Sequence, residues 1–268
     1  MQANFKLPPL HELMDELRLW FASDLGQQLL SAERAAIEKM IGSVFGYHLL
    51  QVGYLPDFLL YQQAAASHKF LMIPEIGLGM PEAAVVGSPS ELPFASGCID
   101  AVILHHALDF AESPHQVLRE ATRVLRPGGK LIVVSFNPAS LWGLYHAITK
   151  KKRLVPWCAH FMRQRRLNDW LTLLEFKQER LQSGFYRPPF NNQRWMGRLA
   201  RIENWGERYF SKNGAFHITM ATKETLAATP VSMSWRRRLA FPLAREPLQQ
   251  VGRSRLQTIE IDEKKAED

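Results

Sequence analysis

Two short apolar runs, residues 99–104 and 130–136, lack the regular alternation of polar and apolar positions that marks a half-exposed strand. Runs of this kind are typical of strands buried on both faces of a parallel sheet. Between them, apolar positions recur at helical spacing and predict one helix that buries Val117, Leu118, Ala121, Val124 and Leu125. Strand, helix and strand within 38 residues predict a βαβ unit, whose crossover is almost always right-handed.

Local signals mark both ends of this helix. Ser113 is expected to be the N-cap, with Gln116 as its capping-box partner and Pro114 at the first helical position. The Pro-Gly-Gly run at residues 127–129 is expected to end the helix, because proline cannot continue it and glycine favours the turn that follows.

The same reading extends to the rest of the chain. We expect two helices within residues 9–42, the second beginning at Ser31. Further strands are expected at residues 47–55, 70–73, 178–185 and 215–223. Further helices are expected at residues 140–148, 168–176 and 192–210. The predicted organisation is an N-terminal helical extension, an α/β domain and a disordered tail of weak periodicity, at residues 1–45, 46–225 and 226–268.

Composition limits the class of protein. A hydrophobic content of 46% and a charged content of 22% are ordinary for a globular domain. The two cysteines, Cys98 and Cys158, form no C-x-x-C pair, which argues against a disulfide framework or a zinc site, and no metal site is expected. No apolar run is long enough to span a bilayer and no signal-peptide pattern opens the chain, so we expect a cytoplasmic protein.

Three sequence motifs carry a family resemblance. Glu-Leu-Pro-Phe at 91–94 precedes a strand that starts Gly-Cys-Ile-Asp at 97–100, and Val-Leu-Arg-Pro-Gly-Gly-Lys-Leu follows at 124–131. Together they resemble the class I S-adenosylmethionine (SAM) methyltransferases of the type-11 group, over roughly residues 45–225. Residues 136–144 and 166–176 are similar to an uncharacterised bacterial branch of that family.

The resemblance implies a Rossmann-like class I methyltransferase fold. Its seven-stranded, mostly parallel sheet would end in an antiparallel strand and carry an N-terminal helical cap. SAM would be the cofactor, bound in the crevice at the carboxyl ends of the strands. The cofactor-binding residues that this implies are Gln51, Val52, Gly53, Glu75, Ser88, Pro89 and His106.

The cofactor motif is altered in this sequence. Family members end the first strand with an acidic residue and three spaced glycines, whereas here Gln51 replaces the acid and Gly53 is the one glycine that remains. Ser88 replaces the acid that would contact adenine, and Glu75 comes one residue late for the ribose. We therefore expect weak SAM binding. The alternative is that residues 51–57 form a plain strand-to-helix turn.

Catalytic residues are not identified by spacing. His105 and His106 follow the central strand, and adjacent strand residues point to opposite faces, so we expect that they cannot serve one site. Asn137 and Trp142 are candidates on the substrate side. Asn137 follows a strand at the carboxyl edge of the sheet. It is either a substrate contact or a turn residue, and the sequence favours neither role.

A basic segment stands out in the charge pattern, on a chain whose net charge is +7. It has no acidic residue and contains Lys150, Lys151, Lys152, Arg153, Arg163, Arg165 and Arg166. Aromatic residues interleave with these cations, which suits an anionic partner such as nucleic acid or an anionic lipid surface. The alternative is a solvated insertion beside the active site.

Two hypotheses for function follow. The first is a SAM-dependent methyltransferase, whose methyl transfer needs mainly positioning and desolvation and no obvious catalytic base. The second is a methyltransferase-like binding module that has lost catalysis and uses its basic face for an anionic partner.

Overall fold

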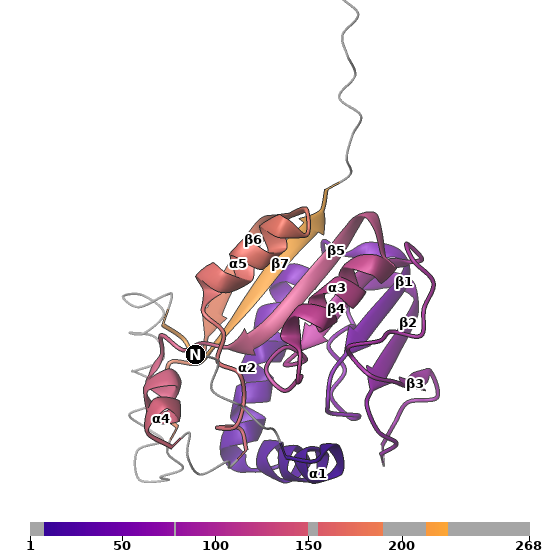
Figure 1. Ribbon diagram of the computed structural model, residues 1–268. Helices are drawn as coiled ribbons and strands as arrows, with labels where there is room; N and C mark the ends of the chain where they lie inside the picture. The colour runs from indigo at the N-terminus through magenta and orange to yellow at the C-terminus, as the bar shows by residue number, and fades with distance from the viewer. Residues whose placement is uncertain (1–7, 78, 150–154, 190–212, 225–268) are drawn as a thin grey trace, which may run out of the picture. The chain divides into compact units, whose positions relative to one another are not determined.

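The computed structural model describes residues 8–77, 79–149, 155–189 and 213–224 (Figure 1). Its strands form one seven-stranded sheet in the order β3-β2-β1-β4-β5-β7-β6. The described strands are β1 (Phe45–Val52), β2 (Ala65–Ile73), β3 (Ala84–Val86), β4 (Ile99–His105), β5 (Leu125–Phe136), β6 (Phe176–Gly184) and β7 (Phe216–Lys223). The described helices are α1 (Leu10–Phe21), α2 (Asp24–Ile41), α3 (Pro114–Val124), α4 (Leu141–Thr149) and α5 (Gln164–Leu173).

The sheet confirms the predicted fold class. All neighbouring strands pair in parallel except β7, which is antiparallel to both β5 and β6. The strand order reverses between β1 and β4, and open α/β sheets bind ligands at the carboxyl ends of the strands beside such a reversal.

Helices cover both faces of the sheet, and the alternation of strand side chains divides the core between them. On β4, Ala101 and Ile103 pack with α1, α2 and α4, whereas Val102 and Leu104 pack with α3 and α5. Figure 1 shows α3 and α5 on the near side of the sheet and α2 on the far side. Both faces of β4 are thus buried, as the lack of alternation in its apolar run predicted.

The second helix begins earlier than predicted. Ser23 is its N-cap, and the Ser23 hydroxyl accepts a hydrogen bond from the Gly26 amide at 3.2 Å. Ser31, which was predicted to begin this helix, lies in its interior and is exposed. The prediction was wrong because Ser23 and Ser31 both have the chemistry of an N-cap, and the buried Leu29 and Leu30 already belong to the helix.

The predicted capping box of α3 is also wrong. Ser113 occupies the N-cap position and Pro114 opens the helix, but the Ser113 side chain makes no capping hydrogen bond. The helix ends at Val124 and β5 starts at once with Leu125. Fixed φ at Pro114 and burial of the apolar face therefore define α3 without a side-chain cap.

The connection from β1 to β2 contains no helix, so the alternative of a plain strand-to-helix turn at residues 51–57 is wrong. Residues 53–64 are irregular and pack into the core, where they bury Tyr54, Leu55, Phe58, Leu60 and Tyr61. Parallel strands usually connect through a helix. Here α2, which precedes β1 in the chain, covers this face of the sheet instead. No helix N-terminus therefore follows β1.

Some predictions fall outside the described residues. These are the helix at 192–210, the tail at 226–268 and the cations at 150–153. The chain divides into two compact units, Met1–Leu226 and Ala227–Asp268, and the described residues all belong to the first. Within the described ranges, no helix is both long enough and apolar enough to cross a membrane.

Candidate functional site

Gln51 lies at the end of β1, and its side chain holds the irregular connection that follows. The buried amide donates a hydrogen bond from Nε2 to the Phe58 carbonyl at 2.6 Å. Its Oε1 accepts one from the Leu60 amide at 2.8 Å. Both polar atoms of the Gln51 amide are therefore bonded inside the protein. Gln51 thus holds the irregular connection in place, where parallel strands are usually joined by a helix.

The predicted residues at the ends of β2 and β3 lie side by side. Ile73 pairs with Val86 in register, and the Gly87 amide donates to the Ile73 carbonyl at 3.0 Å. Glu75 and Ser88 each follow their strand by two residues, so both reach the same edge of the sheet. Glu75 is half-buried, and Ser88 is exposed.

Three other predicted cofactor residues, Val52, Gly53 and Pro89, are buried near this edge of the sheet. Val52 and Gly53 are buried where β1 leaves the sheet, and the Gly53 amide donates to the Met72 carbonyl at 3.1 Å. A Cβ added to Gly53 would meet the His105 carbonyl at 3.4 Å, so this position is close to β4. Pro89 is buried beside Ser88.

The loop that follows β2 is packed against other segments. Gly77 has no space for a Cβ, because that atom would overlap the Arg18 guanidinium of α1. A Cβ on Gly79 would overlap the Asp57 carboxylate, and Gly79 has a φ of +83° that favours glycine. The glycines at this turn thus allow the loops after β1 and β2 to approach each other and α1.

His105 and His106 converge on one carboxylate, against the prediction that they serve opposite faces. Glu33 of α2 lies with Oε2 at 3.0 Å from His105 Nε2 and with Oε1 at 2.9 Å from His106 Nε2. The alternation fails because His106 has a φ of +51°, which turns the chain as it leaves β4. All three side chains are buried.

Asp109 completes this buried cluster. Its Oδ2 lies 2.7 Å from His106 Nδ1 and accepts the Phe136 amide at 2.9 Å. Burial lowers the pKa of His106, but the carboxylates of Glu33 and Asp109 overcome it and raise that pKa to about 9. Burial raises the pKa of Glu33, and the charge on His106 with the histidine hydrogen bonds lowers it to about 2. His106 therefore lies between two carboxylates as a cation at neutral pH.

The two candidates on the substrate side are held inside the protein. Asn137 donates from Nδ2 to the Gly214 carbonyl at 2.8 Å, and its Oδ1 accepts the Ala139 amide at 2.9 Å. These bonds favour the turn alternative for Asn137. Trp142 is fully buried on α4 and donates from Nε1 to the Arg187 carbonyl at 2.8 Å.

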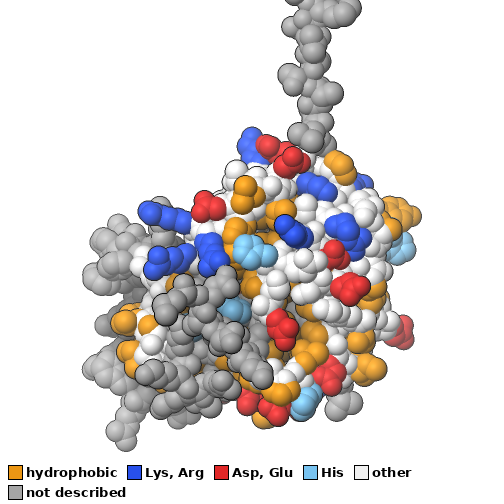
Figure 2. Space-filling model, in the orientation of Figure 1, with side chains coloured by type: hydrophobic (Ala, Val, Ile, Leu, Met, Phe, Trp, Pro, Cys, Tyr) orange, Lys and Arg blue, Asp and Glu red, His pale blue; other side chains and the backbone are white. Residues whose placement is uncertain are grey.

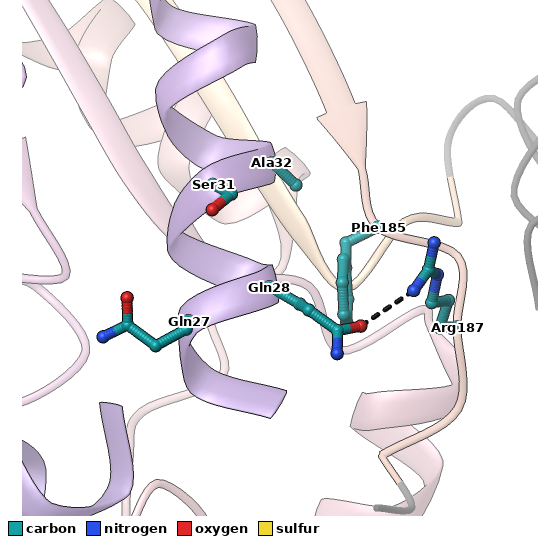
Figure 3. Close-up of a pocket in the computed structure, with 6 residues that line it drawn as sticks. All are labelled: Gln27, Gln28, Ser31, Ala32, Phe185 and Arg187. Atoms are coloured by element: carbon teal, nitrogen blue, oxygen red, sulfur yellow. Dashed lines mark hydrogen bonds between the residues drawn. The ribbon is translucent and has the colours of Figure 1, made fainter. Parts of the chain in front are cut away.

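A pocket of about 420 Å³ lies beside Arg187, whose carbonyl accepts the Trp142 hydrogen bond. It opens between α2 and the segment that follows β6 (Figure 3). Gln28 accepts a hydrogen bond from the Arg187 guanidinium at 2.8 Å across one side of it. Its lining is Gln27, Gln28, Ser31, Ala32, Phe185 and Arg187. β6 runs parallel to β5, so this pocket lies toward the carboxyl edge of the sheet.

Sequence reasoning missed this pocket and the role of Glu33. Glu33 and the polar pocket residues of α2 looked like the solvated side of a covering helix. The one available signal was that Glu33 lies among the apolar positions of its helix. That signal is weak, because surface helices carry many such acids.

The described part of the basic segment is exposed. Arg163, Arg165 and Arg166 lie at the start of α5, and the Arg166 guanidinium lies 4.9 Å from the centre of the Trp170 ring. Figure 2 shows Lys and Arg side chains gathered beside this end of α5. An anionic partner remains a prediction for this segment.

Known proteins resemble this chain in sequence. A family model for a methyltransferase domain matches residues 55–133. The uncharacterised protein YafS of Escherichia coli K12 is 30% identical over 200 residues, which cover 73% of this chain and 78% of YafS. The ubiquinone/menaquinone biosynthesis C-methyltransferase UbiE of Roseobacter denitrificans is 28% identical over 142 residues, which cover 48% of this chain and 52% of UbiE.

Solved structures share the fold. A SAM-dependent methyltransferase from Thermotoga maritima superposes with a TM-score of 0.60 at 18% identity, covering 80% of this chain and 97% of that one. Another from Archaeoglobus fulgidus superposes with a TM-score of 0.52 at 14% identity, covering 71% and 92%. The chain belongs to one family with YafS, and the methyltransferase-domain match at residues 55–133 together with the fold supports its membership of the class I SAM-dependent methyltransferase superfamily.

The chemistry of the candidate cofactor residues suits one half of SAM better than the other. The Glu75 carboxylate can accept two hydrogen bonds from ribose hydroxyls, and the Ser88 hydroxyl is exposed beside it. At the methionine half the fit fails in this conformation, because Gln51 and His106 are already bonded within the protein. Glu75 and Ser88, at the ends of β2 and β3, therefore stay the candidates for the nucleoside half of a SAM site.

Proposed function

We propose that this protein is a SAM-dependent methyltransferase that binds its cofactor weakly. The sheet order carries the proposal: β7 lies antiparallel between β5 and β6, in a sheet whose remaining strands are parallel. The similarity of residues 55–133 to a methyltransferase domain supports it. The partial fit of the cofactor-binding side chains accounts for the weak binding.

The pocket beside α2 is the proposed place of the methyl acceptor. Phe185 offers an apolar surface, and the amides of Gln27 and Gln28 with the guanidinium of Arg187 offer polar groups. Gln28 and Glu33 lie five residues apart on α2, about 8 Å along its axis. The pocket is therefore near the end of β4, where Glu33 contacts His106. These groups favour an acceptor with an apolar body and a polar or anionic end.

Calorimetry and thermal unfolding with SAM and its demethylated product test the cofactor part of this proposal. We expect a rise in the midpoint temperature at high ligand concentration, since a ligand that binds only the folded state stabilises it. Glu75→Gln should reduce that rise. Glu82→Gln, at an exposed position in the same loop, is the matched control and should leave it unchanged.

A second variant tests the altered cofactor motif. Gln51→Asp combined with Ser88→Asp restores two acids, each worth about 1.5–3 kcal/mol as an acceptor of charge-assisted hydrogen bonds. We expect tighter SAM binding by the double variant, although its stability without ligand should fall because Phe58 and Leu60 lose a partner. If saturating SAM and product stabilise neither protein, the enzyme proposal fails and the binding-module hypothesis takes its place.

A further inference from the structure

Three ligand atoms converge where α2 passes the end of β4. The two oxygens of Glu33 lie 3.0 Å from His105 Nε2 and 2.9 Å from His106 Nε2, and one ligand atom from each residue fits within 4.8 Å of the others. In a tetrahedral site with bonds of about 2.0–2.1 Å, ligand atoms lie about 3.4 Å apart. We propose that Glu33, His105 and His106 bind a divalent transition metal of the Zn²⁺ type.

The backbone at His106 is arranged to bring the two histidines together. Consecutive strand residues point to opposite faces, so a regular β4 would separate their rings. The φ of +51° at His106 reverses that direction and leaves the ring centres 4.7 Å apart. Non-glycine residues adopt this conformation rarely, and such residues cluster at ligand and active sites. The strain at His106 is accounted for if both imidazoles serve one ion.

Asp109 supplies the outer shell that a metal-bound histidine needs. Its carboxylate contacts His106 Nδ1 at 2.7 Å and so directs Nε2 toward Glu33. Metal-bound histidines usually donate their second ring N–H to a carboxylate or carbonyl in this way. The Asp109 carboxylate is itself fixed by the Phe136 amide, and its Oδ1 is buried without a hydrogen-bond partner among the described residues.

The surroundings shield the site from bulk water, and its three protein ligands leave one position of a tetrahedral ion open. Aromatic rings enclose the cluster: the Phe58 centre lies 5.0 Å from His105, and the Phe136 centre lies 4.3 Å from His106. A dication would displace the proton that His106 otherwise carries, and its charge would balance those of Glu33 and Asp109 inside this apolar shell. Two imidazole nitrogens and one carboxylate oxygen suit Zn²⁺ or Fe²⁺ better than Ca²⁺ or Mg²⁺. The ion would tie α2 to the carboxyl edge of the sheet.

Metal content and zinc-dependent stability test the site. The full chain is purified without a histidine tag, and its first-row metals are measured by plasma mass spectrometry. We expect close to one metal per chain. After chelation in urea and refolding, Zn²⁺ at 100-fold above its dissociation constant should raise the midpoint temperature by about 5 °C or more. Methyl transfer and SAM binding play no part in either readout.

Variants distinguish this site from adventitious binding. Glu33→Gln and His105→Gln should each lower the zinc affinity at least 10-fold and abolish the temperature shift. The matched control is His68→Gln, because His68 is exposed on β2 and pairs with the half-buried His48 of β1, with ring centres 5.3 Å apart. We expect the control to keep both metal and shift.

X-ray absorption of the zinc-loaded wild type keeps the test independent of variant folding. The expected first shell has nitrogen and oxygen neighbours at about 2.0–2.1 Å, with scattering from two imidazoles and none from sulfur. The proposal is overturned by a wild type that holds less than a tenth of a metal per chain, as isolated and after zinc loading. A sulfur shell, or a zinc affinity unchanged in Glu33→Gln and lost in His68→Gln, overturns it equally.

Discussion

At the scale of single residues, His217 illustrates how burial sets a charge. It lies on β7 with Nε2 2.8 Å from Ser135 Oγ. Burial, with a smaller repulsion from His106, lowers the pKa of His217 to about 4. The folded protein therefore keeps this imidazole neutral at pH values where the unfolded chain already binds a proton.

The pH dependence of stability should report this difference. Between pH 6.5 and about 4 the unfolded state holds the extra proton, so the free energy of unfolding should fall as the pH decreases through this window, by at most about 3 kcal/mol from His217. His217→Gln removes the titration and should show a shallower decline in urea denaturation at pH 7, 5.5 and 4.5. Other groups titrate in the same window, so the difference between the two proteins is the measure. Parallel curves would contradict the prediction.

The two cysteines should differ in reactivity. Cys98 is exposed, whereas Cys158 is buried, and burial raises the pKa of the Cys158 thiol to about 11. The thiolate is the reactive form, so Cys158 should react about 100-fold more slowly than a thiol with its ordinary pKa. With a disulfide reagent, the native protein should show one fast thiol, which Cys98→Ser removes and Cys158→Ser leaves. Two equal rates would show that Cys158 is accessible.

Residue roles were the least predictable part of the site. Gln51, Glu75, Ser88 and His106 were placed by resemblance at one edge of the sheet, and the structure puts all of them at strand ends there. Their partners could not be read from the sequence, because Phe58 and Glu33 reach Gln51 and His106 through loop and helix packing. The left-handed backbone at His106 could not be read from the sequence, since only a few per cent of non-glycine residues adopt it and a histidine alone does not mark such a position.

At the scale of elements, local caps and burial compete to set helix boundaries. The apolar runs and helical spacing of the region from β4 to β5 predicted its elements well, because each faces a core on a fixed period. The start of α2 was predicted wrongly, since Ser31 and Ser23 both have the chemistry of an N-cap. Only the turn between α1 and α2 decides between them, through the Ser23 hydroxyl bonded to the Trp20 carbonyl at 2.6 Å.

Replacing each serine by alanine measures that difference. Ser23→Ala removes the acceptor for the Gly26 amide and should lower the free energy of unfolding by about 1 kcal/mol. Ser31→Ala changes an exposed interior position of the same helix, where alanine has the higher helix propensity, and should stay within about 0.5 kcal/mol of the wild type. Urea denaturation of the two variants gives the comparison, and equal effects would contradict the role of Ser23.

At the scale of the whole molecule, the seven-stranded, mostly parallel sheet was predicted correctly, whereas the strand-to-helix turn considered after the first strand is absent. The family resemblance fixes seven strands with one antiparallel member. The missing helix at residues 53–64 follows from competition for one face of the sheet, because α1 and α2 bury their apolar stripes there. Pairing of a distant N-terminal helix with this face is a long-range contact, and no local pattern in residues 53–64 reveals it.

The exposed side of α4 adjoins the basic segment in the chain. Leu141, Leu144 and Ile148 are spaced by three and four residues and are 52%, 62% and 74% exposed. Lys150 is the next residue in the chain after α4, and Arg163, Arg165 and Arg166 are exposed at the start of α5. Cations in this number attract an anionic partner, whether a polyanion or a lipid surface.

The basic segment is therefore expected to bind polyanions in a salt-dependent way. Replacing Lys150, Lys151 and Lys152 by Glu should abolish retention on heparin at low salt and leave the midpoint temperature unchanged. The matched control carries the same charge change at the exposed residues Lys39, Arg119 and Lys177, and should keep most of the binding.

For single-stranded nucleic acid, the logarithm of the wild-type binding constant should fall with the logarithm of salt concentration by about 0.7 per phosphate contact. If wild-type binding is absent or insensitive to salt, or if both triple variants lose it equally, the segment is a solvated surface and net charge alone governs association.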